Sequence, residues 1–163
     1  MNHLLHAAVI GIGATLLMDL WGVVRQPLFG FARLDYAMIG RWFGHLARGQ
    51  VRHRAIAAAP PIPAERWIGA TAHYLIGIAF AALLLEAFGM AWLVRPTLAP
   101  ALIVGIGTVL APLLIMQPAM GAGIAGSRTA NPTATRVQSL LTHAIYGLGL
   151  YLAGWLDHLV FAP

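Results

Sequence analysis

The chain has 163 residues, of which 60% are hydrophobic and only 9% are charged, and its mean hydropathy is +0.77. A soluble domain carries about 25% charged residues, because water must solvate its surface. This composition excludes an ordinary soluble enzyme and a disordered chain, and it predicts an integral membrane protein whose main partner is the lipid bilayer. The absence of cysteine excludes disulfides and thiolate metal sites.

Four apolar runs are long enough to cross a bilayer as helices, which takes about 20 residues each. We place these spans at approximately residues 4–24, 67–88, 98–116 and 137–161. They form a single transmembrane domain, residues 1–163. The polar connection 25–66 contains a segment, 35–47, whose apolar side chains recur near helical spacing. We predict an amphipathic helix there that lies on the membrane surface.

The ten basic residues, all arginines, are distributed unevenly over the connections between spans. Seven lie in the connection 25–66, two (Arg128 and Arg136) lie between the last two spans, and only Arg95 lies on the opposite side. By the positive-inside rule, the nine arginines face the cytoplasm and both termini face outward. The net charge of +5 therefore indicates loops beside anionic lipids, not nucleic-acid binding.

The two halves of the chain resemble each other. Val9–Gly13 (VIGIG) is similar to Ile103–Gly107 (IVGIG), and a histidine recurs between small residues four positions away in the second and fourth spans. We predict an all-α fold, a four-helix membrane bundle built from two repeated two-helix hairpins related by a pseudo-two-fold axis along the membrane normal. Because four helices enclose little space, we also expect a homodimer.

Three ionisable side chains are predicted at similar depth inside the spans: Asp19, His73 and His143. At about 1.5 Å per residue, each histidine lies roughly 9–10 Å from the cytoplasmic end of its span. Ionisable groups in a span are costly and normally face the protein interior. We interpret the three residues as an intramembrane polar site, with Asp19 as the one formal charge well inside a span.

Several interpretations of this site stay open. It is a structural clamp that satisfies buried polar groups, or a proton or solute pathway, since histidine titrates near neutrality. Alternatively, Asp19, His73 and His143 bind a transition metal, or His73 and His143 bind haem, in a membrane oxidoreductase. Our leading hypothesis is a small-solute or ion transporter or channel. The remaining alternative is an accessory or assembly protein whose first connection docks a partner. No catalytic residue is assigned.

Two further groups of residues are candidates for binding a ligand. Arg41, Arg128 and Asn131 could contact an anion, such as a phosphate or a lipid headgroup. The residues near the chain ends, His3, His6, Asp157 and His158, could bind a transition metal, but we interpret them as ordinary surface residues.

Five segments carry a resemblance to a known family. They are Gly11–Trp21 (GIGATLLMDLW), Tyr36–His45 (YAMIGRWFGH), Ala57–Pro61 (AAAPP), Ala72–Gly77 (AHYLIG) and Met116–Pro132 (MQPAMGAGIAGSRTANP). Together they resemble small bacterial multi-pass inner-membrane proteins grouped as a domain of unknown function. The resemblance implies a location in the bacterial inner membrane, and it assigns neither an activity nor catalytic residues.

Overall fold

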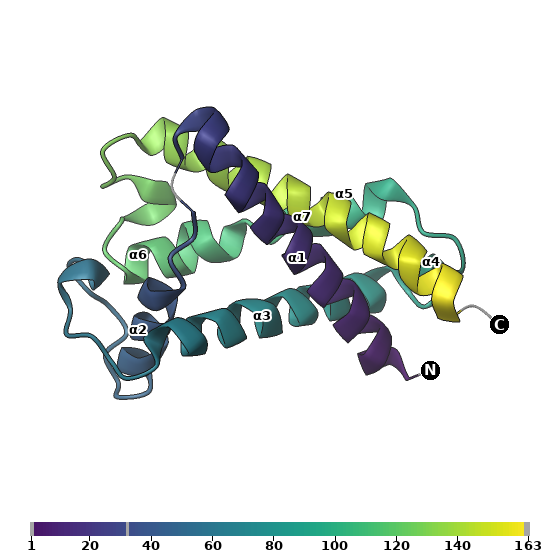
Figure 1. The fold of residues 1–163 in the computed structure, drawn as a ribbon, viewed down its shortest axis with the longest axis horizontal. Helices are drawn as coiled ribbons and strands as arrows, with labels where there is room; N and C mark the ends of the chain where they lie inside the picture. Colours follow the sequence, from purple (N-terminus) through teal and green to yellow (C-terminus); the bar gives the residue numbers. More distant parts are fainter. Residues whose placement is uncertain (1, 32, 162–163) are drawn as a thin grey trace. The chain divides into compact units, whose positions relative to one another are not determined.

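The computed structural model describes residues 2–31 and 33–161, and all regular structure in these ranges is helical (Figure 1). The prediction of an all-α chain is therefore confirmed. In chain order the helices are α1 (His3–Phe29), α2 (Tyr36–Leu46), the 3₁₀ turn η1 (Ile56–Ala58), α3 (Glu65–Phe88), α4 (Ala91–Val94), α5 (Leu98–Gly107), the π-helical turn η2 (Pro112–Met116), α6 (Gln117–Ala119), the 3₁₀ turn η3 (Ile124–Gly126) and α7 (Pro132–Phe161).

Four helical segments are long and apolar enough to cross a membrane, as the sequence predicted. They are His3–Phe29, Glu65–Phe88, Leu98–Ala119 and Pro132–Phe161. Two of them extend well beyond the apolar runs, because capping residues and not hydropathy determine where a helix ends.

The end of α1 and the start of α7 show this capping. Gly30 adopts a left-handed conformation (φ 70°) after α1, and its amide donates to the Gln26 carbonyl. At the other helix, Pro132 occupies the first position and the Asn131 side chain accepts a hydrogen bond from the Ala134 amide at 3.0 Å. Consequently α1 continues five residues past the predicted end at Val24, and α7 starts five residues before Val137.

The third apolar segment is interrupted by proline. Pro112 has no amide hydrogen to donate back to the preceding turn, and the backbone widens there into the π-helical turn η2. The span thus consists of α5, η2 and α6 in succession, where the sequence predicted a single span over residues 98–116.

The chain divides into two compact units. Unit 1 comprises Met1–Arg33, Tyr74–Thr108 and Leu141–Pro163, and unit 2 comprises Leu34–His73 and Val109–Leu140. Helices α3 and α7 each contribute residues to both units.

The core of unit 1 is made of small and aliphatic side chains from α1, α3, α5 and α7. Ile10, Leu84 and Leu150 are completely or almost completely buried in it. Trp92 on α4 also belongs to this core, and its ring packs against Gly154 of α7.

Glycines allow close approach of two helix pairs in unit 1. A Cβ atom on Gly11 of α1 would lie 2.5 Å from the Ile78 Cα atom of α3, and one on Gly77 would collide with the Thr15 hydroxyl. Between α5 and α7, a Cβ atom on Gly105 would collide with the backbone of Gly147. Backbones this close pack tightly without a hydrophobic driving force, which suits helices in lipid.

Unit 2 is built around α2, which lies beside the first turns of α3 (Figure 1). A Cβ atom on Gly40 would collide with the Glu65 carbonyl, and one on Gly69 with the Tyr36 carbonyl. A helix thus forms within the predicted range 35–47, and every residue of it is buried or half-buried in the protein. Its contact with a membrane surface stays a prediction.

The glycine contacts make a prediction with an internal control. Gly11→Ala should lower the free energy of unfolding by about 1–3 kcal/mol, because the new methyl group meets backbone and cannot be accommodated by a side-chain rotation. Gly22, on the same helix, has no heavy atom within 4 Å of a built Cβ. Gly22→Ala should leave stability unchanged or raise it by up to about 1 kcal/mol.

Unfolding in detergent, followed by circular dichroism, measures both effects. Gly105→Ala and Gly107→Ala form a second matched pair on α5, since a Cβ on Gly107 also meets open space. Equal losses of stability in both members of a pair would contradict the proposed helix contacts.

Candidate functional site

Asp19 on α1 is held by a tyrosine of α3. The Tyr74 hydroxyl donates to the Asp19 Oδ2 atom at 2.9 Å, and the carboxylate is half-buried. Tyr74 follows directly after the predicted site residue His73, and sequence reasoning missed it because a tyrosine in an apolar run reads as packing. The structure therefore gives Asp19 a hydrogen-bonding partner within unit 1.

His143 on α7 is bound by a threonine at the end of α5. The Thr108 Oγ1 atom lies 2.9 Å from the His143 Nδ1 atom and donates its own proton to the Gly105 carbonyl at 2.6 Å. Because the hydroxyl proton is already used, Nδ1 must carry the proton of that hydrogen bond. In the neutral imidazole the lone pair of the ring then belongs to Nε2.

Arg25 connects α1 with α7, the helices that carry Asp19 and His143. The sequence analysis had assigned it to the polar connection 25–66. It is instead part of α1, 8% exposed, and its Nη1 atom donates to the Thr142 hydroxyl of α7 at 3.0 Å. The misassignment followed from ending the span where apolar residues end.

His73 belongs to unit 2, where its ring packs against Tyr36 with centroids 5.4 Å apart. Asp19 and His143 belong to unit 1. Within residues 2–31 and 33–161, no group of three or more histidine and acidic side chains could hold a metal ion. The metal interpretation of Asp19, His73 and His143 thus gains no support, and the haem interpretation of His73 and His143 stays a prediction.

The most buried charged side chain is Asp157 near the end of α7, which sequence analysis interpreted as a surface residue. Asp157 is 1% exposed, and its Oδ2 atom lies 2.6 Å from the Nδ1 atom of His6 on α1. Position in the chain suggested exposure, but pairing across 151 residues gives no signal in a single sequence.

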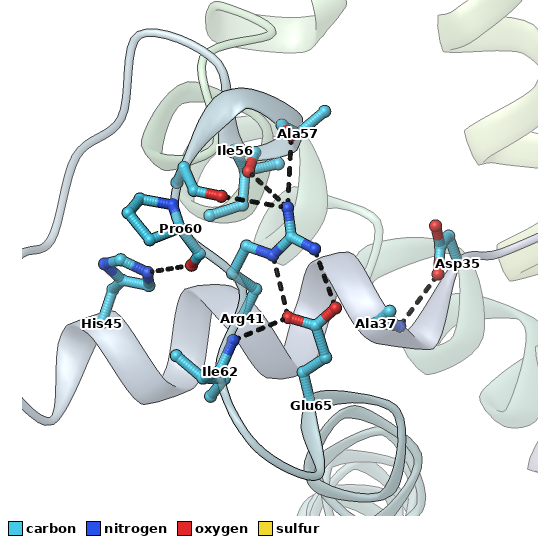
Figure 2. A network of polar contacts seen from close by, with 10 residues as sticks. Asp35, Ala37, Arg41, His45, Ile56, Ala57, Pro60, Ile62 and Glu65 are labelled. Carbon is cyan, nitrogen blue, oxygen red and sulfur yellow. Dashed lines mark hydrogen bonds and ion pairs between the residues drawn. The ribbon is translucent and has the colours of Figure 1, made fainter.

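In unit 2, Arg41 and Glu65 form a two-point ion pair (Figure 2). The Arg41 Nε and Nη2 atoms donate to the two carboxylate oxygens at 2.9 and 2.8 Å, and the Ile62 amide donates to the same carboxylate at 3.1 Å. The hydrogen bond to Glu65 raises the pKa of the Arg41 guanidinium above its ordinary value, so Arg41 stays charged at all relevant pH.

The remaining nitrogen of Arg41 holds the loop between α2 and α3. Nη1 lies 3.2–3.4 Å from the carbonyls of Ile56, Ala57 and Ala59, and the Nε2 atom of His45 lies 2.9 Å from the Pro60 carbonyl (Figure 2). Arg41 is 9% exposed. We predicted an anion or lipid contact for Arg41, but its three nitrogens are engaged inside the protein.

The other two predicted anion contacts differ in their surroundings. Asn131 caps α7 through its side-chain oxygen, as described above, whereas Arg128 is exposed beside η3. Gly121, Gly123, Ala125 and Gly126 all have positive φ in this region, so the backbone before Arg128 turns sharply. Anion or lipid binding at Arg128 stays a prediction.

These observations define an all-helical protein with four helices of membrane-crossing length and hydrogen-bonded polar side chains between them. Residues 8–157 match the family described as "Protein of unknown function (DUF2938)", and the chain belongs to that family. No curated protein and no solved structure matches the chain. The resemblance to a family of unknown function is thereby confirmed.

The ion pair of unit 2 yields a prediction for the loop that it holds. Arg41→Lys keeps the charge but loses the planar fork, so it should release the carbonyls of Ile56–Ala59. Hydrogen–deuterium exchange at the Ile56 and Ala59 amides should then be on the order of tenfold faster. Arg52→Lys, at an exposed position of the same loop, is the control and should leave exchange unchanged. Equal exchange in both variants would show that Arg41 does not hold the loop.

Proposed function

We propose that the chain is a multi-pass inner-membrane protein with four spans, its arginine-rich connections in the cytoplasm and both termini outside. Large apolar side chains are exposed along the long helices, among them Leu16, Leu75, Ile103 and Leu152. Only 28% of the most apolar stretch of α1 is buried inside the protein. Lipid is the solvent that would favour such a surface.

We further propose that the spans form two duplicated hairpins, α1 with α3 and α5 through α6 with α7. The repeated glycines support this arrangement. Gly11 contacts the backbone at Gly77 and Ile78, and Gly105, its counterpart in the repeat, contacts Gly147, the counterpart of Gly77. A homodimer of these bundles remains part of the proposal.

We propose proton-linked movement of a small solute or ion as the function. The observation that carries it is the position of His143, an ionisable side chain of an apolar helix that is hydrogen-bonded to Thr108 within unit 1. A second proton acceptor, the Asp19 carboxylate, lies on α1 of the same unit and is oriented by Tyr74. Ionisable side chains in apolar helices commonly mark proton relays in transporters.

The two acceptors are suited to different parts of such a cycle. The carboxylate is negative when unprotonated and would attract a proton or a cation, whereas the imidazole is neutral and becomes positive. The hydrogen bonds from Tyr74 to Asp19 and between Thr108 and His143 hold each acceptor in one direction within the protein.

The proposed orientation is testable because the chain contains no cysteine. Ala58→Cys in the loop after α2 and Met90→Cys between α3 and α4 are both exposed positions. In intact bacterial cells, a membrane-impermeant maleimide should label the cysteine at position 90 and not the one at 58. Permeabilised cells should show labelling at both, and the reverse pattern in intact cells would overturn the orientation.

The proposed function is tested in proteoliposomes that contain a pH-sensitive dye. Under a potassium diffusion potential, or with an outward gradient of each solute in a panel, the native chain should move protons. Asp19→Asn should reduce that rate by about tenfold or more, because the amide cannot be protonated. Glu86→Gln, which alters an exposed carboxylate (side chain 74% exposed), should retain the native rate.

Two outcomes would decide against this function. Proton flux equal to that of empty vesicles for all solutes would exclude proton-linked transport of those solutes. Equal flux in the native chain and in Asp19→Asn would exclude a role of Asp19 in moving protons. Circular dichroism of each variant in detergent establishes that the reconstituted protein is folded.

A further inference from the structure

A second polar site lies where α1 begins and α7 ends, in unit 1 (Figure 1). His6 and Asp157 meet there with Nδ1 and Oδ2 2.6 Å apart. The Asp157 side chain is 1% exposed and the His6 side chain 12% exposed. This separation is short for a nitrogen–oxygen pair and is typical of a charge-assisted hydrogen bond.

The pair uses only one of the two carboxylate oxygens. The Asp157 Oδ1 atom is buried and has no hydrogen-bond partner among the residues that the structure describes. A buried carboxylate oxygen without a donor is costly, and it leaves an acceptor position that a proton can fill. The His6 ring packs edge-on against Phe161 and is the more exposed member of the pair.

We propose that the His6–Asp157 pair is a proton-binding site, in which acidification transfers a proton from solvent to the Asp157 Oδ1 atom. The proton comes from a hydronium ion, one of whose O–H bonds breaks as the Asp157 O–H bond forms, and a water molecule is left. The imidazolium–carboxylate pair of zero net charge thereby becomes an imidazolium beside a neutral carboxyl group. The hydrogen bond then has an uncharged acceptor, which weakens the connection between α1 and α7.

The ligand is a proton and not a metal ion. No cluster of three or more histidine and acidic side chains suitable for a metal exists in the part of the chain that the structure describes. At the start of α1, the end of α3, the end of α4 and the end of α7, the other histidine, acidic and basic side chains are His3, Glu86, Arg95 and His158. His3 and Glu86 pair with each other at 3.5 Å, Arg95 is exposed, and the His158 ring packs against Trp155.

A comparison with the other closely paired acid supports the assignment. In unit 2 both carboxylate oxygens of half-buried Glu65 accept hydrogen bonds, from Arg41 and from the Ile62 amide. Asp157 has a partner at Oδ2 only, so its second oxygen is the one that can take up a proton. The site therefore responds to protons whether or not the chain moves a solute, and it does not rest on the proposed transport function.

Infrared difference spectroscopy of the complete chain in nanodiscs tests the proposal, because the chain has only five acidic residues. Between about pH 8 and about pH 4, which spans the ordinary titration of imidazole and carboxyl groups, a carboxyl C=O band should appear that Asp157→Asn removes. His6→Gln should change the pH dependence of the same band, since the carboxylate has lost the partner that lies 2.6 Å from it.

Glu86→Gln is the matched control, because it removes the exposed acid of the neighbouring pair and should leave the Asp157 band unchanged. If Asp157→Asn does not fold, isotope-labelled aspartate combined with Asp19→Asn and Asp35→Asn assigns the band by elimination. A chain in which no band belongs to Asp157, or in which His6→Gln leaves its pH dependence unchanged, would overturn the proposal. The two proposals fail independently. Loss of proton flux in Asp19→Asn with an unchanged Asp157 band would support both transport through Asp19 and a separate proton-binding site at Asp157.

Discussion

The structure depends on one constraint: long helices that are largely apolar must satisfy their few buried polar side chains within the protein. Burying an unpartnered hydroxyl, amide or charge costs more than a typical hydrogen bond returns. Tyr74 fulfils this requirement for Asp19, and Thr108 fulfils it for His143. Each pair joins two different helices, so satisfying the polar group also fixes the position of one helix against another.

Glycine brings the helices that carry these pairs close together, because a side chain at the contact points would collide with the neighbouring helix. Gly77 is the clearest case. Its missing side chain leaves room for the Thr15 hydroxyl of α1, and its carbonyl accepts a hydrogen bond from the Tyr146 hydroxyl of α7 at 2.6 Å. One residue of α3 thus contacts two other helices, and any side chain there would displace at least one of them.

The sequence predicted what depends on local composition. Four spans, the all-helical class and the family follow from apolar runs and short motifs, and the structure and the family match agree with them. Helix ends were less accurate, since Gly30 and Asn131 end and begin helices by capping, which hydropathy does not detect.

The pairing of side chains was predicted least well. The single sequence contains no signal that connects Arg41 with Glu65 or His6 with Asp157, because side-chain pairing depends on tertiary packing. Arg41 was for this reason interpreted as a contact for anions, and Asp157 as a surface residue. His73 and His143 were grouped by their recurrence in the repeat, although the two belong to different compact units.

The identity of each acid's partner indicates where the protein can respond to protons. All five acidic side chains accept a hydrogen bond or form an ion pair: Asp19 with Tyr74, Asp35 with the Ala37 amide, Glu65 with Arg41, Glu86 with His3 and Asp157 with His6. Only the last two partners are histidines, the side-chain type that ordinarily changes charge near neutrality. Glu86 is largely exposed and solvated, so its ion pair with His3 contributes little to the free energy of unfolding. Among these pairs, a change in protonation therefore has its largest structural consequence at Asp157, where the surrounding protein excludes the water that would otherwise compensate for it.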